Sequence, residues 1–255
     1  MKLFYMLIFI FSTTLLGDTV YDIRGTSPLL DANMTQFLEQ WRTDTVAPIQ
    51  HGEYTNVFVN GESTKKIIAL TFDDAPDENN THLLLDILDK HGVKASFFMI
   101  GATMNDENIT SVKRAFNEGH LVLNHTFNHP RLTNLENNTT ILQLERTASR
   151  IEEITGKYPL LMRPPYGSIN TQVVNAVNGS GYTTILWSLD SLDWTLKDPY
   201  AVANNVIGNI RNGDIILMHR NRTSVASLEM IIETLHSIGY TFTTLDKLLG
   251  IKAYR

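Results

Sequence analysis

From Lys65 to the end of the chain, apolar segments that fit buried strands alternate with amphipathic segments that fit helices. The strand-like segments are Ile67–Phe72, Ala95–Ile100, Leu121–Leu123, Tyr158–Met162, Thr183–Ser188, Ile215–His219 and Thr241–Thr243. The helix-like segments are Leu83–His91, Ile109–Asn117, Ile141–Ile154, Gln172–Val177, Ala201–Ile210 and Leu228–Ile238. Strands that alternate with helices form parallel sheets with the helices outside, so the pattern predicts an α/β barrel or an open α/β sheet.

Residues 18–64 show no clean hydrophobic period. A short helix is expected from Met34 to Trp41. The rest of this segment is interpreted as an N-terminal extension that packs on the domain formed by residues 65–250. The chain shows no internal repeat and no low-complexity tract.

The first 17 residues have the pattern of a secretory signal peptide. Lys2 precedes the apolar run Leu3–Phe11, and Gly17 is a suitable residue before a cleavage site. The run is too short for a comfortable transmembrane helix, and an uncleaved anchor is the alternative interpretation. We therefore expect a secreted protein, extracellular or in a cell wall, with no stable membrane insertion.

Asn-x-Ser/Thr sequons point weakly in the same direction, towards a glycoprotein on a eukaryotic secretory route. Eight of them are present, although the chain is Asn-rich and several can arise by chance. They begin at Asn33, Asn79, Asn108, Asn124, Asn137, Asn138, Asn178 and Asn221.

Composition narrows the chemistry. The chain has 255 residues, 43% of them hydrophobic, which is enough for a sizeable core. Its net charge of -6 argues against a nucleic-acid partner, which would require a basic face. Because the chain has no cysteine, it offers neither disulfides nor thiolates, and any metal must be held by histidines and carboxylates.

Two polar motifs follow predicted strands and together suggest a metal site. Asp73 and Asp74 end the strand Ile67–Phe72, and adjacent buried acids require a cation or a proton between them. A polar turn is the alternative interpretation of this pair. His125 and His129 follow the strand Leu121–Leu123, and on one helical turn their spacing would place both imidazoles on the same side. Two histidines and a carboxylate are a common ligand set for zinc or a similar divalent ion.

Three further motifs follow later strands. The loop from Arg163 to Gly167 contains two prolines, so it could hold a backbone N–H in a fixed position, although a simple turn explains it equally well. The segment Asp190–Trp194 joins two acids to a tryptophan that could line a sugar-binding groove or lie in the core. His219 ends the strand Ile215–His219, where a structural histidine is the alternative. In parallel sheets active sites collect at the carboxyl ends of strands, so these motifs are expected to meet.

Together the five motifs resemble those of the polysaccharide deacetylases, carbohydrate esterase family 4. The resemblance covers roughly Lys65 to Leu249 and implies a distorted (β/α) barrel. The matching motifs are Thr71-Phe72-Asp73-Asp74, His125-Thr126-x-x-His129-Pro130, Arg163-Pro164-Pro165-Tyr166-Gly167, Asp193-Trp194 and Leu217-x-His219.

The resemblance implies a role for each matching residue. Asp73 would be the general base, oriented by Arg163, and His219 the general acid, with Asp193 setting its pKa. The backbone N–H of Tyr166 would stabilise the oxyanion. The implied metal ligands are Asp74, His125 and His129. The implied substrate contacts are Trp194, Tyr166 and Leu217.

By the same resemblance, the chain is expected to be a metal-dependent hydrolase that removes N-acetyl groups from N-acetylglucosamine units and releases acetate. Chitin or a related N-acetylglucosamine polymer is the substrate that we expect first. The alternatives are a peptidoglycan N-acetylglucosamine deacetylase, an acetylxylan esterase and a non-catalytic carbohydrate-binding wall protein. Zinc is the expected metal, and the ligand set also accepts cobalt or nickel.

Two positions depart from the family pattern. Ala75 stands where the family usually has glycine, and its methyl group is expected either to crowd the substrate or to alter the turn. Arg220 stands where an acid is often found. Neither departure removes a catalytic group.

Overall fold

A computed structural model describes residues 19–62 and 64–255 of the chain. Within these residues parallel strands form one curved sheet in the order β1-β6-β5-β4-β3-β2-β8-β7, with β9 paired to the start of β2. The strands are β1 Val57–Phe58, β2 Ile67–Ala75, β3 Ser96–Met99, β4 Leu121–Asn124, β5 Leu161–Met162, β6 Thr183–Ile185, β7 Leu189–Asp190, β8 Ile215–His219 and β9 Thr241–Phe242.

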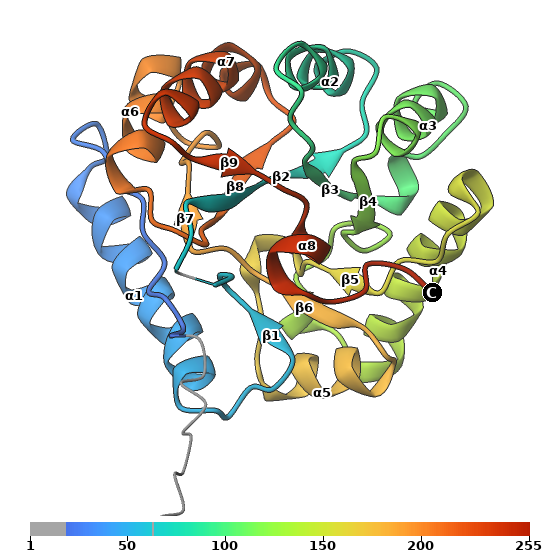
Figure 1. Cartoon of the computed structure of the whole chain (residues 1–255). Coiled ribbons are helices and arrows are strands. Elements are labelled where there is room, and N and C mark those ends of the chain that lie inside the picture. Colours follow the sequence, from blue (N-terminus) through green and yellow to red (C-terminus); the bar gives the residue numbers. More distant parts are fainter. Residues whose placement is uncertain (1–18, 63) are drawn as a thin grey trace, which may run out of the picture.

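Helices surround the outer face of this sheet (Figure 1). The α-helices are α1 Ala32–Gln50, α2 Asn80–Lys90, α3 Ile109–Asn117, α4 Asn137–Thr155, α5 Thr171–Gly179, α6 Pro199–Asn209, α7 Arg222–Ser237 and α8 Leu245–Leu249. The short 3-10 helices are η1 Gly101–Thr103, η2 Leu132–Asn134 and η3 Pro165–Gly167. The predicted distorted (β/α) barrel is therefore confirmed.

The apolar run of β2 explains why this strand lies at the centre of the sheet. Ile68, Leu70 and Phe72 pack in the core cluster that also contains the buried faces of α2, α6 and α7. Ala69 belongs to a second cluster, which contains Leu217 of the neighbouring strand β8. Because successive side chains of a strand point to opposite faces, a strand buried on both faces must be apolar throughout.

The N-terminal helix α1 lies on the side of the barrel where the edge strands β1 and β7 lie (Figure 1). Its first turn is capped by Asp31, whose side chain accepts a hydrogen bond from the Met34 N–H at 2.7 Å. The predicted helix Met34–Trp41 was too short, because α1 runs from Ala32 to Gln50 and includes Pro48. The extension is joined to the domain through β1, which pairs with β6.

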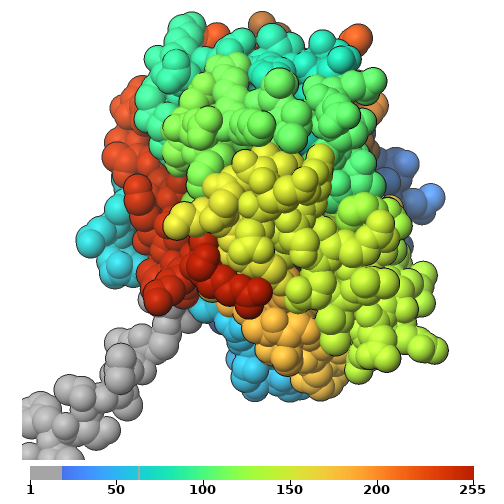
Figure 2. Space-filling model, turned by 90° about the vertical axis from the view of Figure 1, so that its right-hand side faces the viewer, coloured from blue at the N-terminus to red at the C-terminus, as the bar shows by residue number. Residues whose placement is uncertain are grey.

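The last residues of the chain pack against the region that precedes β5. Tyr254 forms an isolated bridge with Pro159, and its hydroxyl accepts a hydrogen bond from the Val122 N–H at 2.8 Å. Figure 2 shows this red C-terminal segment lying against the yellow surface of the α4 region. The predicted signal peptide lies outside the described residues. Within residues 19–62 and 64–255, no helix combines the length and apolar character needed to cross a membrane.

Candidate active site

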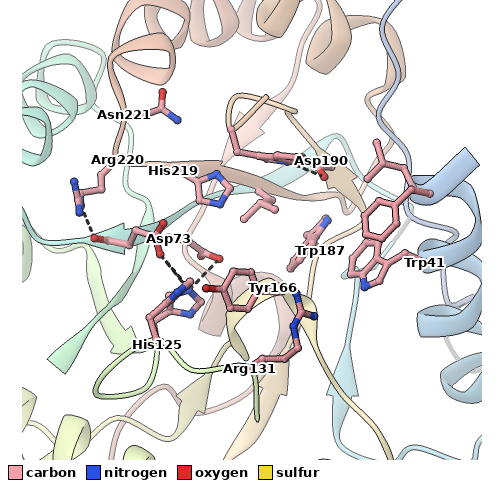
Figure 3. A pocket seen from close by; sticks show the side chains of 16 residues that line it. Trp41, Asp73, His125, Arg131, Tyr166, Trp187, Asp190, His219, Arg220 and Asn221 are labelled. Carbon is pink, nitrogen blue, oxygen red and sulfur yellow. Dashed lines mark hydrogen bonds and ion pairs between the residues drawn. The ribbon is translucent and has the colours of Figure 1, made fainter. Parts of the chain in front are cut away.

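The carboxyl ends of β2, β4, β5 and β8 surround a cavity of about 460 Å³ (Figure 3). Helix α1 supplies a further part of its wall, opposite the histidines. The lining residues are Phe37, Leu38, Trp41, Asp73, Asp74, His125, His129, Arg131, Tyr166, Trp187, Asp190, Trp194, Leu217, His219, Arg220 and Asn221. The sequence motifs that follow different strands thus meet in one place.

A β-bulge turns both adjacent aspartates of β2 towards this cavity. The register of β2 against β3 shifts between Asp73 and Ala75, and Asp74 has a φ of 67°. On a regular strand the two carboxylates would point to opposite faces of the sheet. Because a bulge bends the strand and re-aims one side chain, Asp73 and Asp74 both reach the cavity.

Arg163 fixes Asp73 in place. Its guanidinium is completely buried and donates from Nη1 to Asp73 Oδ1 and to Thr71 Oγ1, each at 2.8 Å. Its other nitrogens donate to the carbonyls of Leu186, at 2.8 Å, and Ile185, at 3.3 Å. A buried cation with this many acceptors cannot easily turn away, so Asp73 faces a fixed positive charge.

Asp74, His125 and His129 form a compact group of potential metal ligands, with all their donor atoms within 4.8 Å of one another. Asp74 Oδ1 lies 3.1 Å from His129 Nε2 and 3.6 Å from His125 Nε2. The group contains two imidazoles and one carboxylate, which is the donor set that divalent zinc-like ions prefer.

The side chains of this group have the properties of ligands. His125 Nδ1–H donates to the Arg163 carbonyl at 2.8 Å, which leaves the Nε2 lone pair directed towards Asp74. Burial lowers the pKa of His125, which favours the neutral imidazole that a metal requires. Asp74 Oδ1 is buried and accepts no hydrogen bond of normal geometry from the residues that the structure describes. An orphaned carboxylate oxygen between two imidazoles fits a divalent cation.

Electrostatics keep Asp74 ionised. Burial alone would raise the pKa of this carboxyl, but the contact with His129 and the charge of His219 outweigh burial and lower the pKa well below its usual range. An ionised carboxylate is the form that binds a metal.

The two histidines reach this arrangement from a loop and not from a helical turn, so that part of the prediction was wrong. Thr126 and His129 both have positive φ angles, of 67° and 57°. Asn124 Oδ1 accepts from the Thr126 N–H at 2.9 Å, and Gln143 of α4 accepts from the next two N–H groups. These side chains replace the backbone bonds that a helix would have made.

His219 and Asp193 form a second fixed pair across the cavity. His219 Nδ1 lies 2.7 Å from Asp193 Oδ1, and Asp193 Oδ2 accepts from the His219 N–H at 2.6 Å and from Ser224 Oγ. Burial would lower the pKa of His219, but the Asp193 carboxylate outweighs burial and raises it to about 10. The imidazole therefore carries a proton at neutral pH.

Tyr166 lies beside the metal-ligand group, in the loop that follows β5. Its φ of 61° is unusual for a residue other than glycine, and the prolines that precede it restrict the backbone. The ring contacts His129 edge to face at 4.7 Å between centroids and is 53% exposed. The exposed ring thus forms part of the cavity wall.

Trp194 and Leu217, for which the family resemblance implied substrate contacts, also line the cavity. Trp194 is 37% exposed, and its Nε1–H donates to Asp190 Oδ1 at 3.2 Å. Leu217 is nearly completely buried in β8. Asp190 therefore orients a tryptophan of the cavity wall.

The two departures from the family pattern differ in position, because Ala75 lies in the core whereas Arg220 lines the cavity. Ala75 is completely buried in the core cluster and does not line the cavity, so its methyl group does not crowd a substrate. Arg220 donates from Nε to the Asp74 carbonyl, and its Nη1 lies 3.3 Å from Asp77 Oδ2. It ties the end of β8 to the end of β2 and to the loop that follows β2.

Sequence reasoning missed six residues of the cavity wall, namely Phe37, Leu38, Trp41, Arg131, Trp187 and Asn221. Phe37 and Trp41 come from α1, and Arg131 follows His129-Pro130. Phe37 and Trp41 are four residues apart and share one face of the helix, a spacing that could have drawn attention to them. Arg131 carries no comparable signal, because an arginine in a loop is usually only solvated.

The fold and this arrangement of groups define a cavity at the carboxyl ends of barrel strands that contains a group of potential metal ligands, and comparisons with known proteins give the family. Residues 60–185 match the family model named polysaccharide deacetylase. A peptidoglycan-N-acetylglucosamine deacetylase of Bacillus cereus is 40% identical over 202 residues, which cover 74% of this chain and 91% of that protein. The chain belongs to the polysaccharide deacetylase family.

A second relative is much longer than this chain. The peptidoglycan-N-acetylglucosamine deacetylase PgdA of Listeria monocytogenes is 40% identical over 190 residues, which cover 74% of this chain and 40% of that protein. The chain thus spans well under half the length of this relative.

Solved structures of the family share the fold. A peptidoglycan N-acetylglucosamine deacetylase superposes with a TM-score of 0.76 and 33% identity, over 80% of this chain and 97% of that one. The chitin deacetylase of Colletotrichum lindemuthianum superposes with a TM-score of 0.73 and 29% identity, over 78% of this chain and 95% of that one. A pseudoenzyme of the family from Bacillus anthracis superposes with a TM-score of 0.71 and 30% identity, over 75% of this chain and 68% of that one. The fold is thus shared by proteins with different substrates and by a protein described as a pseudoenzyme.

Proposed function

We propose that the protein is a metal-dependent N-deacetylase that removes acetyl groups from the N-acetylglucosamine units of peptidoglycan. One observation carries the deacetylase proposal, namely that three sets of side chains face one cavity. These sets are Asp73 with its partner Arg163, the group of Asp74, His125 and His129, and the pair of Asp193 and His219. A base, a metal site and an acid are the three elements that amide hydrolysis requires.

In this proposal each side chain has a separate task. A divalent metal held by Asp74, His125 and His129, with zinc as our first candidate, would polarise the acetamide carbonyl and acidify a water molecule. Asp73, held by its ion pair with Arg163, accepts the proton as the water attacks the carbonyl carbon. The Tyr166 backbone N–H stabilises the developing oxyanion. His219 donates its proton to the departing amine nitrogen, and the products are acetate and a free glucosamine unit.

Relatives favour peptidoglycan over chitin, which was our first expectation from the sequence. The Bacillus cereus and Listeria monocytogenes relatives are both peptidoglycan-N-acetylglucosamine deacetylases. Chitin is the second candidate, supported by the chitin deacetylase of Colletotrichum lindemuthianum, which this chain covers over 95% of its length. Because the reacting unit is N-acetylglucosamine in both polymers, the groove around it must decide the choice.

A cell-wall substrate agrees with the secretion that residues 1–17 suggest. We therefore propose that the protein acts outside the cytoplasm. The N-terminal sequence of the purified protein distinguishes the two interpretations of this segment. A protein in the culture medium that lacks residues 1–17 has a cleaved signal peptide, whereas a protein in membranes that retains them has an uncleaved anchor.

Acetate release tests the function directly. The metal-loaded protein should release acetate from purified peptidoglycan and less from chitin oligomers or acetylxylan of equal acetyl content, and a chelator should stop the reaction. Re-addition of zinc should restore it. A metal-loaded protein that releases no acetate from any of the three glycans, while still binding one of them, would instead be a carbohydrate-binding protein with the fold of the family.

A further inference from the structure

The cavity is larger than the acetamide chemistry requires, and its far wall comes from α1. Phe37, Leu38 and Trp41 line this wall, which faces the catalytic histidines across the cavity (Figure 3). A volume of about 460 Å³ is in the range of complete ligand pockets, so more than one acetyl group has room there. Helix α1 precedes the span of the family model, which begins at residue 60.

The α1 wall presents aromatic surface to the cavity. Phe37 is 61% exposed, although a large apolar side chain on a helix would normally turn to the core. Trp41 stacks on Trp187 at 5.5 Å between ring centroids, which holds its position. Tyr166, which is also exposed, lines the same cavity. Exposed aromatic faces around a cavity are suited to stacking against the apolar faces of sugar rings.

Arg131 adds a positive charge that has no ion-pair partner among residues 19–62 and 64–255. Its guanidinium lies 4.6 Å from the centroid of the Tyr166 ring and lines the cavity. Arg220, the other arginine that lines the cavity, pairs with Asp77. The buried Arg163 pairs with Asp73. Arg131 is therefore placed to bind an anionic group of a ligand.

The acids of the cavity do not compete for this charge. Asp73 is paired with Arg163, and Asp74 belongs to the metal-ligand group. Asp190 is buried, and its carboxylate accepts from the Leu192 N–H and from Trp194 Nε1. A guanidinium held against an aromatic ring presents its fork of N–H donors in a fixed plane, which matches a carboxylate.

We propose that α1 and Arg131 form a subsite for a carboxylate-bearing sugar unit, attached to the N-acetylglucosamine that is deacetylated. This proposal rests on the proposed function and sharpens it. In peptidoglycan every second sugar carries a lactyl group with a carboxyl function or a peptide, whereas chitin carries no charge of this kind. The sugar ring would lie against Phe37, and its carboxylate would bind Arg131.

The test compares two glycans of equal length. One consists of N-acetylglucosamine alone, and in the other N-acetylglucosamine alternates with N-acetylmuramic acid bearing free carboxylates. In Arg131→Gln the ratio of kcat/KM for the charged glycan over that for the neutral glycan should fall roughly fivefold, the size of a solvent-exposed charge pair. Arg131→Lys should restore part of the ratio. High salt should reduce the ratio of the wild type but not that of Arg131→Gln.

Arg146→Gln is the matched control, because its guanidinium also lies on an aromatic ring, 3.6 Å from the Phe127 centroid, outside the cavity. It should leave the ratio unchanged. Equal losses on both glycans in Arg131→Gln, or no loss, would overturn the subsite and leave the proposed function intact.

Binding measurements test the subsite without any dependence on turnover. Calorimetry on metal-loaded Asp73→Asn should show tighter binding of the charged glycan, and the preference should disappear when Arg131→Gln is added. If the wild type releases no acetate but this binding preference exists, the proposed function fails and the subsite stands. Equal binding of both glycans overturns the subsite.

Discussion

The cavity has two walls that differ in construction. The catalytic wall consists of side chains at strand ends (Asp73, Asp74, His125, His129 and His219), which are buried or half-buried and held by ion pairs or hydrogen bonds. The helix wall consists of Phe37, Leu38 and Trp41 of α1, of which Phe37 is mostly exposed. One wall is rigid and charged, and the other is apolar and open.

This difference suggests a division of labour between chemistry and recognition. A base or an acid must be held within a fraction of an ångström, and buried charges are tolerated only when they are fully paired. A sugar-binding surface needs only shape and aromatic area, so a helix added to the barrel can supply it. The catalytic wall should therefore tolerate almost no change, whereas changes in the helix wall should alter the choice of glycan.

The largest effect is expected from the catalytic wall, at Asp73. Asp73→Asn keeps the shape and a hydrogen-bond acceptor for Arg163 but loses the basic carboxylate. The kcat should fall by about 1,000-fold, within the range for a lost general base. Acetate release from peptidoglycan measures kcat, and metal analysis of the purified variant should show full metal content.

Asp74→Asn provides the contrast for this prediction. It should also be inactive, but it should lose metal, because Asp74 is the one carboxylate of the ligand group. The assignment of the two aspartates would be wrong if Asp73→Asn lost its metal while Asp74→Asn retained it.

The contrast between the walls also explains how much the sequence could predict. The alternation of apolar strands and amphipathic helices located most of the barrel, and strand ends placed Asp73, His125 and His219 in one region. The bulge that turns Asp74 into the cavity depends on a register shift against β3. The loop geometry of His129 depends on side chains of Asn124 and Gln143. The register against β3 and the contact with Gln143 join segments that are separate in the sequence, so local propensity does not encode them.

The helix wall was missed for a different reason. Helix α1 has a weak hydrophobic period because it buries one narrow face, including Leu38 and Ile49, and leaves Phe37 at the cavity. A pattern that measures burial cannot recognise an apolar residue that is exposed for binding. The family motifs do not include this helix, so the resemblance could not supply it either.

A smaller effect is expected at Asp193, which fixes the acid. Asp193→Asn removes the charge that raises the pKa of His219 to about 10, so burial lowers this pKa. His219 would lose its proton at lower pH, and the alkaline limb of the kcat profile should move down by more than one pH unit. At pH 7 the kcat should fall by roughly 100-fold.

The same pair predicts a pH dependence of stability. The folded pKa of His219, about 10, lies above its ordinary value of 6.5. The ion pair therefore contributes fully below about pH 6.5, and its contribution is lost as the pH rises through about 10. Urea unfolding at several pH values should show this loss in the wild type and not in Asp193→Asn.

Ser224→Ala, which removes one donor to Asp193 without removing charge, should keep the alkaline limb of the kcat profile. An unchanged limb in Asp193→Asn would show that another group controls it.

The smallest effect is expected where the two walls meet, at Gly167. A Cβ on this residue would lie 2.6 Å from the Trp41 ring of α1 and 2.8 Å from Trp187. Gly167→Ala should push α1 away from the loop that carries Tyr166 and destabilise the protein by about 1–3 kcal/mol. Because Tyr166 lies next to the displaced residue, kcat should fall by roughly tenfold. Denaturant unfolding and acetate release measure the two effects.

Gly156→Ala separates this contact from the strain of the backbone. Gly156 ends α4 with a φ of 71°, close to the 57° of Gly167, but a Cβ there would meet no atom of the described residues within 4 Å. Both variants carry the cost of a left-handed alanine, so the difference between them reports the clash with the tryptophans. Trp41→Ala added to Gly167→Ala should recover part of the lost kcat, since it removes the nearer ring. Suppose that Gly156→Ala and Gly167→Ala lose equal stability and both keep full kcat. The position of α1 then does not affect the catalytic wall, and α1 contributes only through its contacts with the substrate.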